Sequence, residues 1–556
     1  MKRGQLLIVL LAVVAIIAVA VGKFGGGGGS PDQGKDVKNR QANPGATRVE
    51  VAASPEKVAL LGPLAKKYTA EHPDVDVEIR SASSGDEEKA LAAGRSKPTV
   101  WSPASSLWGR LLDHEADTAL VPDDNPSIVR SPLVIAMWEP LARALGWPKK
   151  RIGFADVLRL ARAPRGWGSV GHPEFGRFKY VHTNPDVSTS GLEAVAAEYS
   201  TAAGKREGLT LADLGRVKPT IRAIERAIVH YGDTTLYIAD QLRRNGPGYA
   251  SAVAMEETTL VDFNRHRGRQ PRLVALYPRE GTFVSDSPYI IPRAPWVTAR
   301  QRAAAEAFQK FLADEIDAQT AARYGFRPAD PSSPAVAPVA AVNGADPAQP
   351  TRLLGLPEPA VLAGIQRAWR ADRKPANVLL VLDTSGSMSQ EGRLDRAKDG
   401  LGVFLRQLAP FDRVGLLTFS NRLRLAVPVG EFRRNGRRLR SVVRQLFPDG
   451  ETALYDATAR SVALVRSLKD DSRINAVVLL TDGQDTASSA KPKQVVAELR
   501  RQSGVEGGDV RVFTIAYGSD ADRIGLAAIA AASNGQGYEG KPEDIERVYR
   551  SISSFF

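Results

Sequence analysis

Short apolar runs alternate with helical patterns along most of the chain. From residue 47 onward the order is RVEVAAS, KVALLGPLAKKYTAEH, VDVEIRSASS, DEEKALAAGR and TVWSPASS, which predicts alternating strands and helices. From residue 377 onward, NVLLVLD, VGLLTFS, LRLAVPV, NAVVLLTDG and VRVFTIAYG predict strands, with helical stretches such as LYDATARSVALVRSL and PEDIERVYRSISSF between them. This alternation predicts α/β domains built on parallel sheets with crossover helices.

Segments without this alternation divide the chain. Two basic residues precede an apolar run over residues 6–21, which as a helix would span about 24 Å of a hydrocarbon core of about 30 Å. We predict that residues 1–24 form a signal anchor or transmembrane helix, with the rest of the chain outside the cell. The alternative is a signal peptide cleaved after Ala20, which would release the protein.

Two further segments are predicted to connect the folded units. Residues 25–46 are rich in glycine and polar side chains, which predicts a flexible tether. Residues 328–372 form a Pro/Ala-rich linker that ends in a short helix. The predicted domains therefore span residues 47–327 and 373–556.

The amino-acid composition limits the metal sites, nucleophiles and partners that the chain can have. The 556 residues include no cysteine, which excludes disulfides, thiolate metal sites and a cysteine nucleophile. The six histidines all lie before residue 267, so the C-terminal half has only oxygen ligands for a metal. The net charge is +13, but the densest basic cluster, around Arg433–Arg440, has the spacing of an amphipathic helix with a solvated face. We therefore predict no nucleic-acid partner.

Hydroxyl side chains follow the predicted strands of the first domain. Such sheets bind ligands beyond the carboxyl ends of their strands, where hydroxyls and helix N-termini suit a polar ligand. Helix capping is the alternative explanation for each of these residues. They are Ser54, Ser83, Ser84, Ser105, Ser106, Ser188, Thr189 and Ser190.

This domain resembles the type II periplasmic solute-binding proteins, especially their molybdate-like branch. The matching stretches include TVWSPASS, SPLVIAMW, FGRFKYVHTNPDVSTSGL, VAMEET and YPREGTFVSDSPYIIPRAPW. The resemblance implies two lobes, joined near Pro132–Trp138 and Ala275–Gly281, that clamp a small-molecule solute. The ligand contacts that it implies are Ser54, Ser84, Ser105, Thr189, Ser190 and Glu256. The acid at Glu256 disfavours a tetrahedral oxyanion, and a domain that serves only as a scaffold is the alternative.

Oxygen-bearing residues end two strands of the C-terminal domain. Asp383 ends NVLLVLD, and Ser385 and Ser387 follow it in the turn. Asp482 lies next to the last residue of NAVVLLTDG, and Thr452 precedes a predicted helix. We expect all five at one edge of the sheet, because parallel strands end at the same edge. Two carboxylates and three hydroxyls suit a hard divalent cation, whereas zinc and copper prefer nitrogen or sulfur. The alternative is that Asp383 and the serines only cap the first helix.

This constellation resembles the metal-ion-dependent adhesion site of von Willebrand factor type A domains, in which D-x-S-x-S is joined by a separate threonine and aspartate. The resemblance implies a doubly wound, Rossmann-like domain that holds Mg²⁺, or Mn²⁺ or Ca²⁺, through Asp383, Ser385, Ser387, Thr452 and Asp482. It also implies that an acidic side chain of a protein partner completes the coordination of the ion.

Together these features predict a cell-surface module for metal-dependent adhesion or assembly that carries an extracellular solute-binding-like domain. The alternative is a solute receptor for an ABC-type transporter that uses the C-terminal domain for docking. We predict no enzyme activity, because P-loop, G-x-S-x-G and H-E-x-x-H motifs are absent from the sequence. An aspartyl-phosphate hydrolase would need a second acid two residues after Asp383, and that residue is Ser385.

Overall fold

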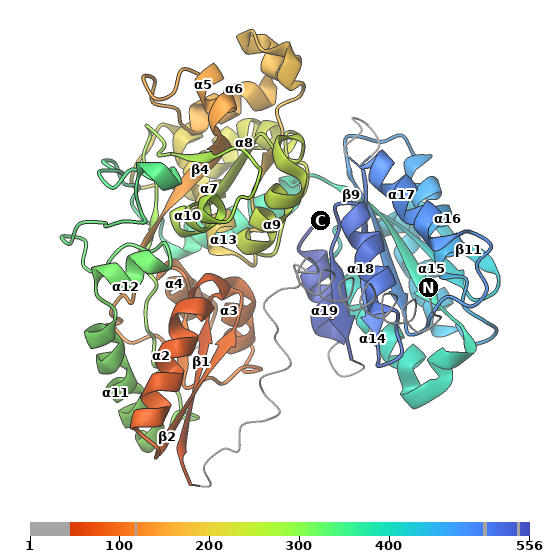
Figure 1. Ribbon diagram of the computed structural model, residues 1–556, viewed down its shortest axis with the longest axis horizontal. Coiled ribbons are helices and arrows are strands. Elements are labelled where there is room, and N and C mark those ends of the chain that lie inside the picture. The colour runs from red at the N-terminus through yellow and green to blue at the C-terminus, as the bar shows by residue number, and fades with distance from the viewer. Residues whose placement is uncertain (1–44, 117–118, 504–508, 542–544) are drawn as a thin grey trace, which may run out of the picture. The chain divides into compact units, whose positions relative to one another are not determined.

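The computed structural model describes residues 45–556, apart from 117–118, 504–508 and 542–544 (Figure 1). The predicted anchor, residues 1–24, lies outside these residues, as does nearly all of the predicted tether, 25–46. Within the described residues, no helix combines the length and the apolar composition that crossing a bilayer requires.

The first lobe of the N-terminal domain contains a parallel three-stranded sheet in the order β2-β1-β3. Alternation in TRVEVAA buries Val49 and Val51 and leaves Arg48 exposed. Leu61 of α2 and Phe308 of α11 belong to the same hydrophobic core. The elements are β1 (Thr47–Ala53), η1 (Pro55–Lys57), α2 (Val58–Glu71), β2 (Val75–Ser81), α3 (Ser84–Ala92), β3 (Val100–Ser102), α4 (Leu107–Glu115), α11 (Ala299–Glu315) and α12 (Ala318–Arg323).

The second lobe is built on a mixed sheet in the order β5-β6-β4-β7, with β8 paired to β4. The strands are β4 (Ser131–Trp138), β5 (Tyr180–Val181), β6 (Ala252–Glu256), β7 (Leu273–Leu276) and β8 (Val284–Ser285). The helices are α5 (Glu139–Ala144), α6 (Phe154–Arg162), η2 (Gly166–Val170), η3 (Pro173–Phe175), α7 (Thr189–Ala203), α8 (Leu211–Glu225), α9 (Thr235–Asn245), η4 (Gly246–Gly248) and α10 (Glu257–Arg265).

The strand directions differ between the two lobes. The alternation of strands and helices from RVEVAAS to TVWSPASS predicts a parallel sheet, which the first lobe confirms, whereas in the second lobe β4 is antiparallel to β6, β7 and β8. The two segments predicted to join the lobes pair with each other here, since Ile135 lies opposite Leu276 and Ala136 opposite Ala275. An apolar run such as SPLVIAMW is buried on both faces in either orientation, so its composition does not reveal the strand direction.

The predicted linker, residues 328–372, packs against the N-terminal domain. Val339 and Ala345 share a small core with Val261 of α10. The helix α13 (Pro359–Asp372) buries Trp369 and contacts α4, α7 and α8, while η5 (Ala341–Asn343) precedes it. This segment is therefore part of the folded domain rather than a bare spacer.

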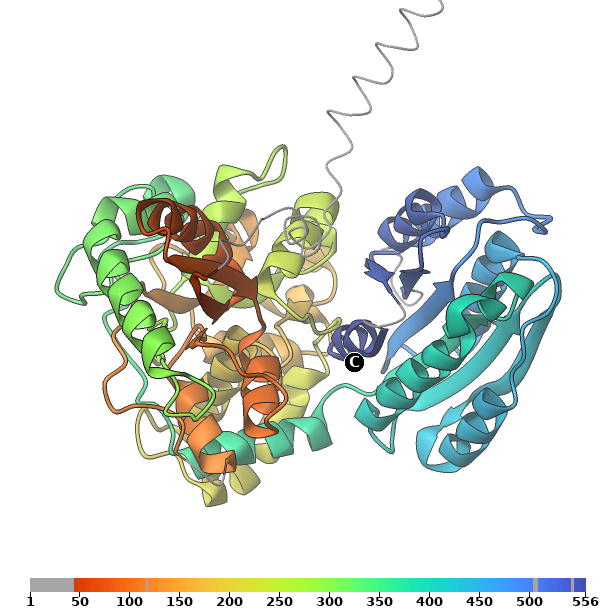
Figure 2. The same cartoon turned by 90° about the horizontal axis from the view of Figure 1, so that it is seen from below.

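The C-terminal domain contains a six-stranded sheet in the order β11-β10-β9-β12-β13-β14, parallel except for β11, with helices on both faces (Figure 2). The strands are β9 (Ala376–Asp383), β10 (Arg413–Phe419), β11 (Leu423–Glu431), β12 (Ile474–Thr481), β13 (Val510–Tyr517) and β14 (Gly537–Gly540). The helices are η6 (Gly386–Gly392), α14 (Arg393–Gln407), α15 (Phe432–Arg444), α16 (Leu454–Arg466), α17 (Pro492–Gln502), α18 (Arg523–Ala532) and α19 (Ile545–Ser553).

The packing of α13 yields a stability prediction. Trp369 is 1% exposed, and its ring lies edge-on to Tyr231 with 5.1 Å between centroids. We expect Trp369→Ala to lower the free energy of unfolding by about 3–5 kcal/mol, because the deletion leaves a cavity. Chemical denaturation measures this. Val342, in the same segment, is 73% exposed, so Val342→Ala is the control and should change little. If both substitutions change the free energy of unfolding by the same small amount, the packing of Trp369 does not stabilise the domain.

Candidate functional site

The carboxyl ends of β9 and β12 bring the predicted metal-site residues together. Asp383 and Asp482 are fully buried, and Ser385 and Thr452 are 1% and 5% exposed. The Ser385 and Ser387 hydroxyl oxygens are 3.0 Å apart, and the Ser387 hydroxyl donates to Asp482 Oδ1 over 2.7 Å. Four of the five predicted residues thus lie in one chain of contacts that starts at Asp383, whose Oδ1 accepts the Ser385 backbone N–H at 2.7 Å.

Thr452 reaches the same place from another loop. A Cβ added to Gly483 would lie 3.3 Å from the Thr452 hydroxyl oxygen and 3.7 Å from the Ser387 hydroxyl oxygen. The missing side chain at Gly483 therefore leaves a small cradle between these hydroxyls, next to Asp482.

Backbone hydrogen bonds hold the three loops in place. The Gly386 N–H donates to the Gly450 carbonyl at 2.9 Å, and the Asp449 N–H donates to the Thr384 carbonyl at 2.7 Å. The Thr452 N–H donates to the Thr486 hydroxyl at 3.0 Å. The site is thereby preorganised by main-chain contacts between the loops after β9 and β12 and the loop before α16.

Burial and neighbours set the charge of Asp383. Burial raises the pKa of this carboxyl to about 6, and the nearby Asp482 adds to the rise. Hydrogen bonds from the Thr481 hydroxyl and from Ser385 favour the ionised form and oppose the shift. Each oxygen of Asp383 and Asp482 accepts one hydrogen bond, which leaves lone pairs for a cation, and a bound cation would lower the cost of burying two negative charges.

The donor set fits a hard divalent cation. Among the described residues, no three acidic, histidine or cysteine side chains are grouped to hold a metal ion. An ion here would depend on two carboxylates, on the hydroxyls of Ser385, Ser387 and Thr452, and on water. This all-oxygen set suits Mg²⁺, Mn²⁺ or Ca²⁺, which keep several waters.

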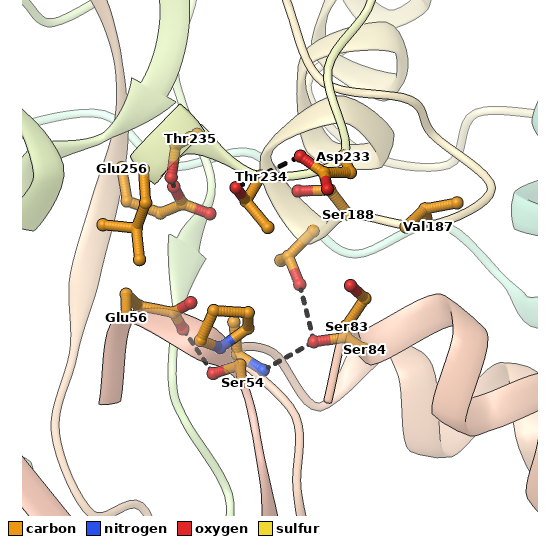
Figure 3. A pocket seen from close by; sticks show the side chains of 14 residues that line it. Ser54, Glu56, Ser83, Ser84, Val187, Ser188, Asp233, Thr234, Thr235 and Glu256 are labelled. Atoms are coloured by element: carbon orange, nitrogen blue, oxygen red, sulfur yellow. Dashed lines mark hydrogen bonds between the residues drawn. The ribbon is translucent and has the colours of Figure 1, made fainter. Parts of the chain in front are cut away.

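A second candidate site is a pocket between the two lobes of the N-terminal domain (Figure 3). Of the predicted contacts, Ser54, Ser84, Thr189 and Glu256 line it. The free space is about 20 Å³, enough for one water-sized molecule. A larger solute would need the lobes to separate.

The other two predicted contacts do not line this pocket. Ser190 is buried and its hydroxyl lies 2.9 Å from that of Thr183, as expected for a structural role near the start of α7. Ser105 is also buried, at 1% exposure.

The lining is acidic, which sequence reasoning found only in part. Glu56 of the first lobe lies across from Glu256 of the second, and Asp233 lies at the start of α9 (Figure 3). The Thr235 hydroxyl donates to Glu256 at 2.9 Å. Neither Glu56 nor Asp233 follows a predicted strand directly, although the D-T-T sequence before α9 is a helix-start pattern that could have drawn attention to Asp233. Ser83 and Ser188, two of the hydroxyl residues expected at strand ends, also line the pocket, as do Thr234 and Thr235, which we did not predict.

Two of these acids, Glu256 and Asp233, are hard to ionise. Burial, with Glu56 nearby, raises the pKa of Glu256 to about 7, and burial raises that of Asp233 to about 6. Glu193, buried behind the pocket, has its pKa raised well above its usual value by burial and by Glu256. No lysine, arginine or histidine is among the described lining residues. The pocket therefore disfavours anions.

Comparisons with known proteins support both domains. A family model described as bacterial extracellular solute-binding protein matches residues 49–327, and a model of the von Willebrand factor type A domain matches residues 377–546. An uncharacterized protein of Mycobacterium tuberculosis is 24% identical over 458 residues, which cover 79% of this chain and 64% of that protein. Human inter-alpha-trypsin inhibitor heavy chain H4 is 27% identical over 168 residues, 29% of this chain and 18% of that protein. The chain thus spans less than two thirds of either relative.

Solved structures resemble each domain in turn. The periplasmic binding protein AfuA from Actinobacillus pleuropneumoniae is 14% identical with a TM-score of 0.43, covering 60% of this chain and 100% of its own. A von Willebrand factor type A structure from Catenulispora acidiphila is 19% identical with a TM-score of 0.28, covering 32% of this chain and 42% of its own. The predicted fold class, a solute-binding-protein fold followed by a doubly wound domain, is confirmed.

The acidic pocket predicts a pH-dependent stability. Glu256 has a pKa of about 7 in the fold and an ordinary one, near 4.5, when unfolded, so the folded state holds the proton more tightly. The stability of the wild type should therefore fall as the pH rises from about 4.5 to 7. Glu256→Gln should make this fall smaller, since the other buried acids still contribute to it, and should be more stable than the wild type at pH 8 by on the order of 2 kcal/mol.

Denaturant titrations at pH 5 and pH 8 measure this difference. Glu358 is an acid of the same domain whose side chain is 76% exposed, so Glu358→Gln is the matched control. If the wild type and Glu256→Gln show the same dependence of stability on pH, Glu256 does not have a raised pKa in the folded protein.

Proposed function

Because the chain belongs to the bacterial extracellular solute-binding protein family and also carries a von Willebrand factor type A domain, we propose that it is a binding protein displayed outside the cell. In this proposal the C-terminal domain captures an acidic side chain of a protein partner through a bound divalent cation. Residues 1–24 attach the protein to the membrane, or are removed to release it. Both domains are of kinds that are typically binding modules rather than enzymes.

One observation carries this proposal. Two buried carboxylates and two hydroxyls, from segments up to 99 residues apart, form one chain of hydrogen-bond contacts, and the hydroxyls of Ser387 and Thr452 lie beside the cradle at Gly483. Helix capping does not require Thr452 and Asp482 to lie there, so a cation is the better reason for collecting these oxygens. Asp383, Asp482, Ser385, Ser387 and Thr452 would hold the ion directly or through water, and the ion would supply a positive centre for the partner's carboxylate.

The proposed metal site predicts the effect of one substitution. Asp383→Ala should weaken the binding of Mn²⁺, measured by isothermal titration calorimetry on the purified chain, by more than about 100-fold, because a buried carboxylate ligand is lost. Asp395, on the neighbouring helix α14, is 80% exposed, and Asp395→Ala is the control that should bind as the wild type does. Circular dichroism checks that both variants are folded. Unchanged Mn²⁺ affinity in a folded Asp383→Ala variant would exclude the site.

A second candidate function is solute capture by the N-terminal domain, either as a receptor for an ABC-type transporter or as a sensor. The observation that favours it is the pocket between the lobes, and its acids favour a cationic solute over an oxyanion. The alternative, a scaffold without a ligand, is consistent with the small free volume of the pocket.

A thermal-shift screen distinguishes these possibilities. We expect at least one organic cation, for example spermidine or choline, to raise the melting temperature, and molybdate and sulfate to have no effect. The rise should be larger at pH 8 than at pH 6, because Glu256 ionises between these values, and Glu256→Gln should reduce it while Glu358→Gln should not. A higher melting temperature with molybdate would contradict the charge argument. If no ligand changes the melting temperature, the domain is better explained as a scaffold without a ligand.

A further inference from the structure

A buried arginine lies at the proposed metal site and has no place in the five-residue pattern. Arg393 is the first residue of α14, and its side chain is 4% exposed. Its Nη1 donates to Asp482 Oδ2 at 2.8 Å, and its Nη2 donates to Asp520 Oδ2 at 3.3 Å. Asp482 is fully buried, whereas the Asp520 side chain is 65% exposed. Arg393 thus connects a proposed metal ligand to an acid at the rim.

The fold makes room for this guanidinium. Gly518, just after β13, has a φ of +84°, and a Cβ there would lie 3.3 Å from Arg393 Cζ and 3.4 Å from Nε. The Tyr517 hydroxyl donates to the Arg393 carbonyl at 3.2 Å, which fixes the start of α14. Arg393 Nε is buried without a hydrogen-bond partner. A solvent-exposed arginine would avoid that loss, so its burial calls for a compensating electrostatic role.

The ion pair with Arg393 gives the two carboxylate oxygens of Asp482 different partners. Oδ2 faces Arg393, and Oδ1 accepts the Ser387 hydroxyl. Only Oδ1 is left for an ion or its water. Rotation of the carboxylate to offer both oxygens would break a buried charge pair, which is strongly unfavourable.

Arg393 also changes the charge that a divalent cation meets. Asp383 and Asp482 alone would neutralise the cation, whereas with Arg393 the same cluster carries a net charge of +1 once the cation is bound. The guanidinium therefore weakens the attraction for the bare ion and strengthens that for a negatively charged ligand on the ion. Asp520, and Glu391, whose Oε2 lies 4.0 Å from Arg393 Nη2, reduce this effect only in part, because both acids are exposed and solvent screens their charges.

We infer that Arg393 is a positioning residue that makes the metal site selective for an anionic ligand, at the expense of affinity for the ion alone. This inference rests on the proposed function, because it presupposes that the site takes up a divalent cation. It implies that the ion and a partner's carboxylate bind cooperatively, each weakly without the other.

Calorimetric titration of the full chain with Mn²⁺, with and without acetate as the carboxylate probe, tests the inference. Matched chloride keeps the ionic strength constant. We expect Arg393→Met to bind Mn²⁺ roughly tenfold more tightly than the wild type without acetate, because one like charge is removed. Acetate should raise the Mn²⁺ affinity of the wild type severalfold and that of Arg393→Met much less. Arg393→Lys, which keeps the charge, should behave like the wild type.

Arg413→Met is the matched control. Arg413 begins β10, at the opposite end of the strands from the site, and pairs with Asp470 at 3.0 Å. Its loss should leave both the Mn²⁺ affinity and the acetate effect unchanged.

The outcomes separate this inference from the proposed function. If the wild type binds Mn²⁺ and a folded Arg393→Met variant binds it equally or more weakly, Arg393 is only structural and the inference fails alone. If neither the wild type nor Arg393→Met binds Mn²⁺, the proposed function fails as well.

If Arg393→Met does not fold, Asp520→Asn decides, because this exposed residue can change without unfolding the domain. Losing the acid that screens Arg393 should weaken Mn²⁺ binding severalfold and enlarge the acetate effect, and the absence of both changes would overturn the inference.

Discussion

The C-terminal domain depends on keeping two carboxylates, those of Asp383 and Asp482, buried at the same edge of its sheet. Burying like charges costs free energy, and the surrounding structure offsets it with hydrogen bonds from Ser385, Ser387 and Thr481 and with the guanidinium of Arg393. Parallel pairing makes this possible, because β12 lies next to β9 in register and both end at the same edge. The short loops, the glycine at 483 and the hydroxyl side chains are all arranged around this one unfavourable juxtaposition.

The sequence predicted site residues best where a polar or charged residue comes at the end of a predicted strand. Asp383 and Asp482 follow continuous apolar runs, so the rule that parallel strands end together was enough to place them at one site. Arg393 could not be found in this way, because it looks like an ordinary helix residue until the fold shows Gly518 opening space for it. The acids Glu56 and Asp233 were missed for a similar reason, since charged residues at helix starts usually lie in solvent.

The pattern predicted the parallel strands of the first lobe and of the C-terminal sheet, but neither the antiparallel strands of the second lobe nor the extent of the first domain. Apolar runs such as that of β4 are compatible with either parallel or antiparallel neighbours, and only long-range pairing decides between them. Residues 328–358 have a composition typical of a linker, but a few apolar side chains, such as Val339 and Leu354, are enough to fix the segment on the domain surface. Low complexity indicates few contacts per residue rather than none.

The joint between α13 and β9 has a mechanical consequence. Asp372 ends α13 and pairs with Arg222 of α8, whereas the next residue, Arg373, pairs with Asp412 of the C-terminal domain at 2.6 Å and is almost fully buried. Adjacent residues are therefore clamped to different domains, and β9 begins only three residues later, at Ala376. Because the two ion pairs flank a single peptide bond, loss of either one would free the backbone within four residues of the start of the strand that ends in Asp383.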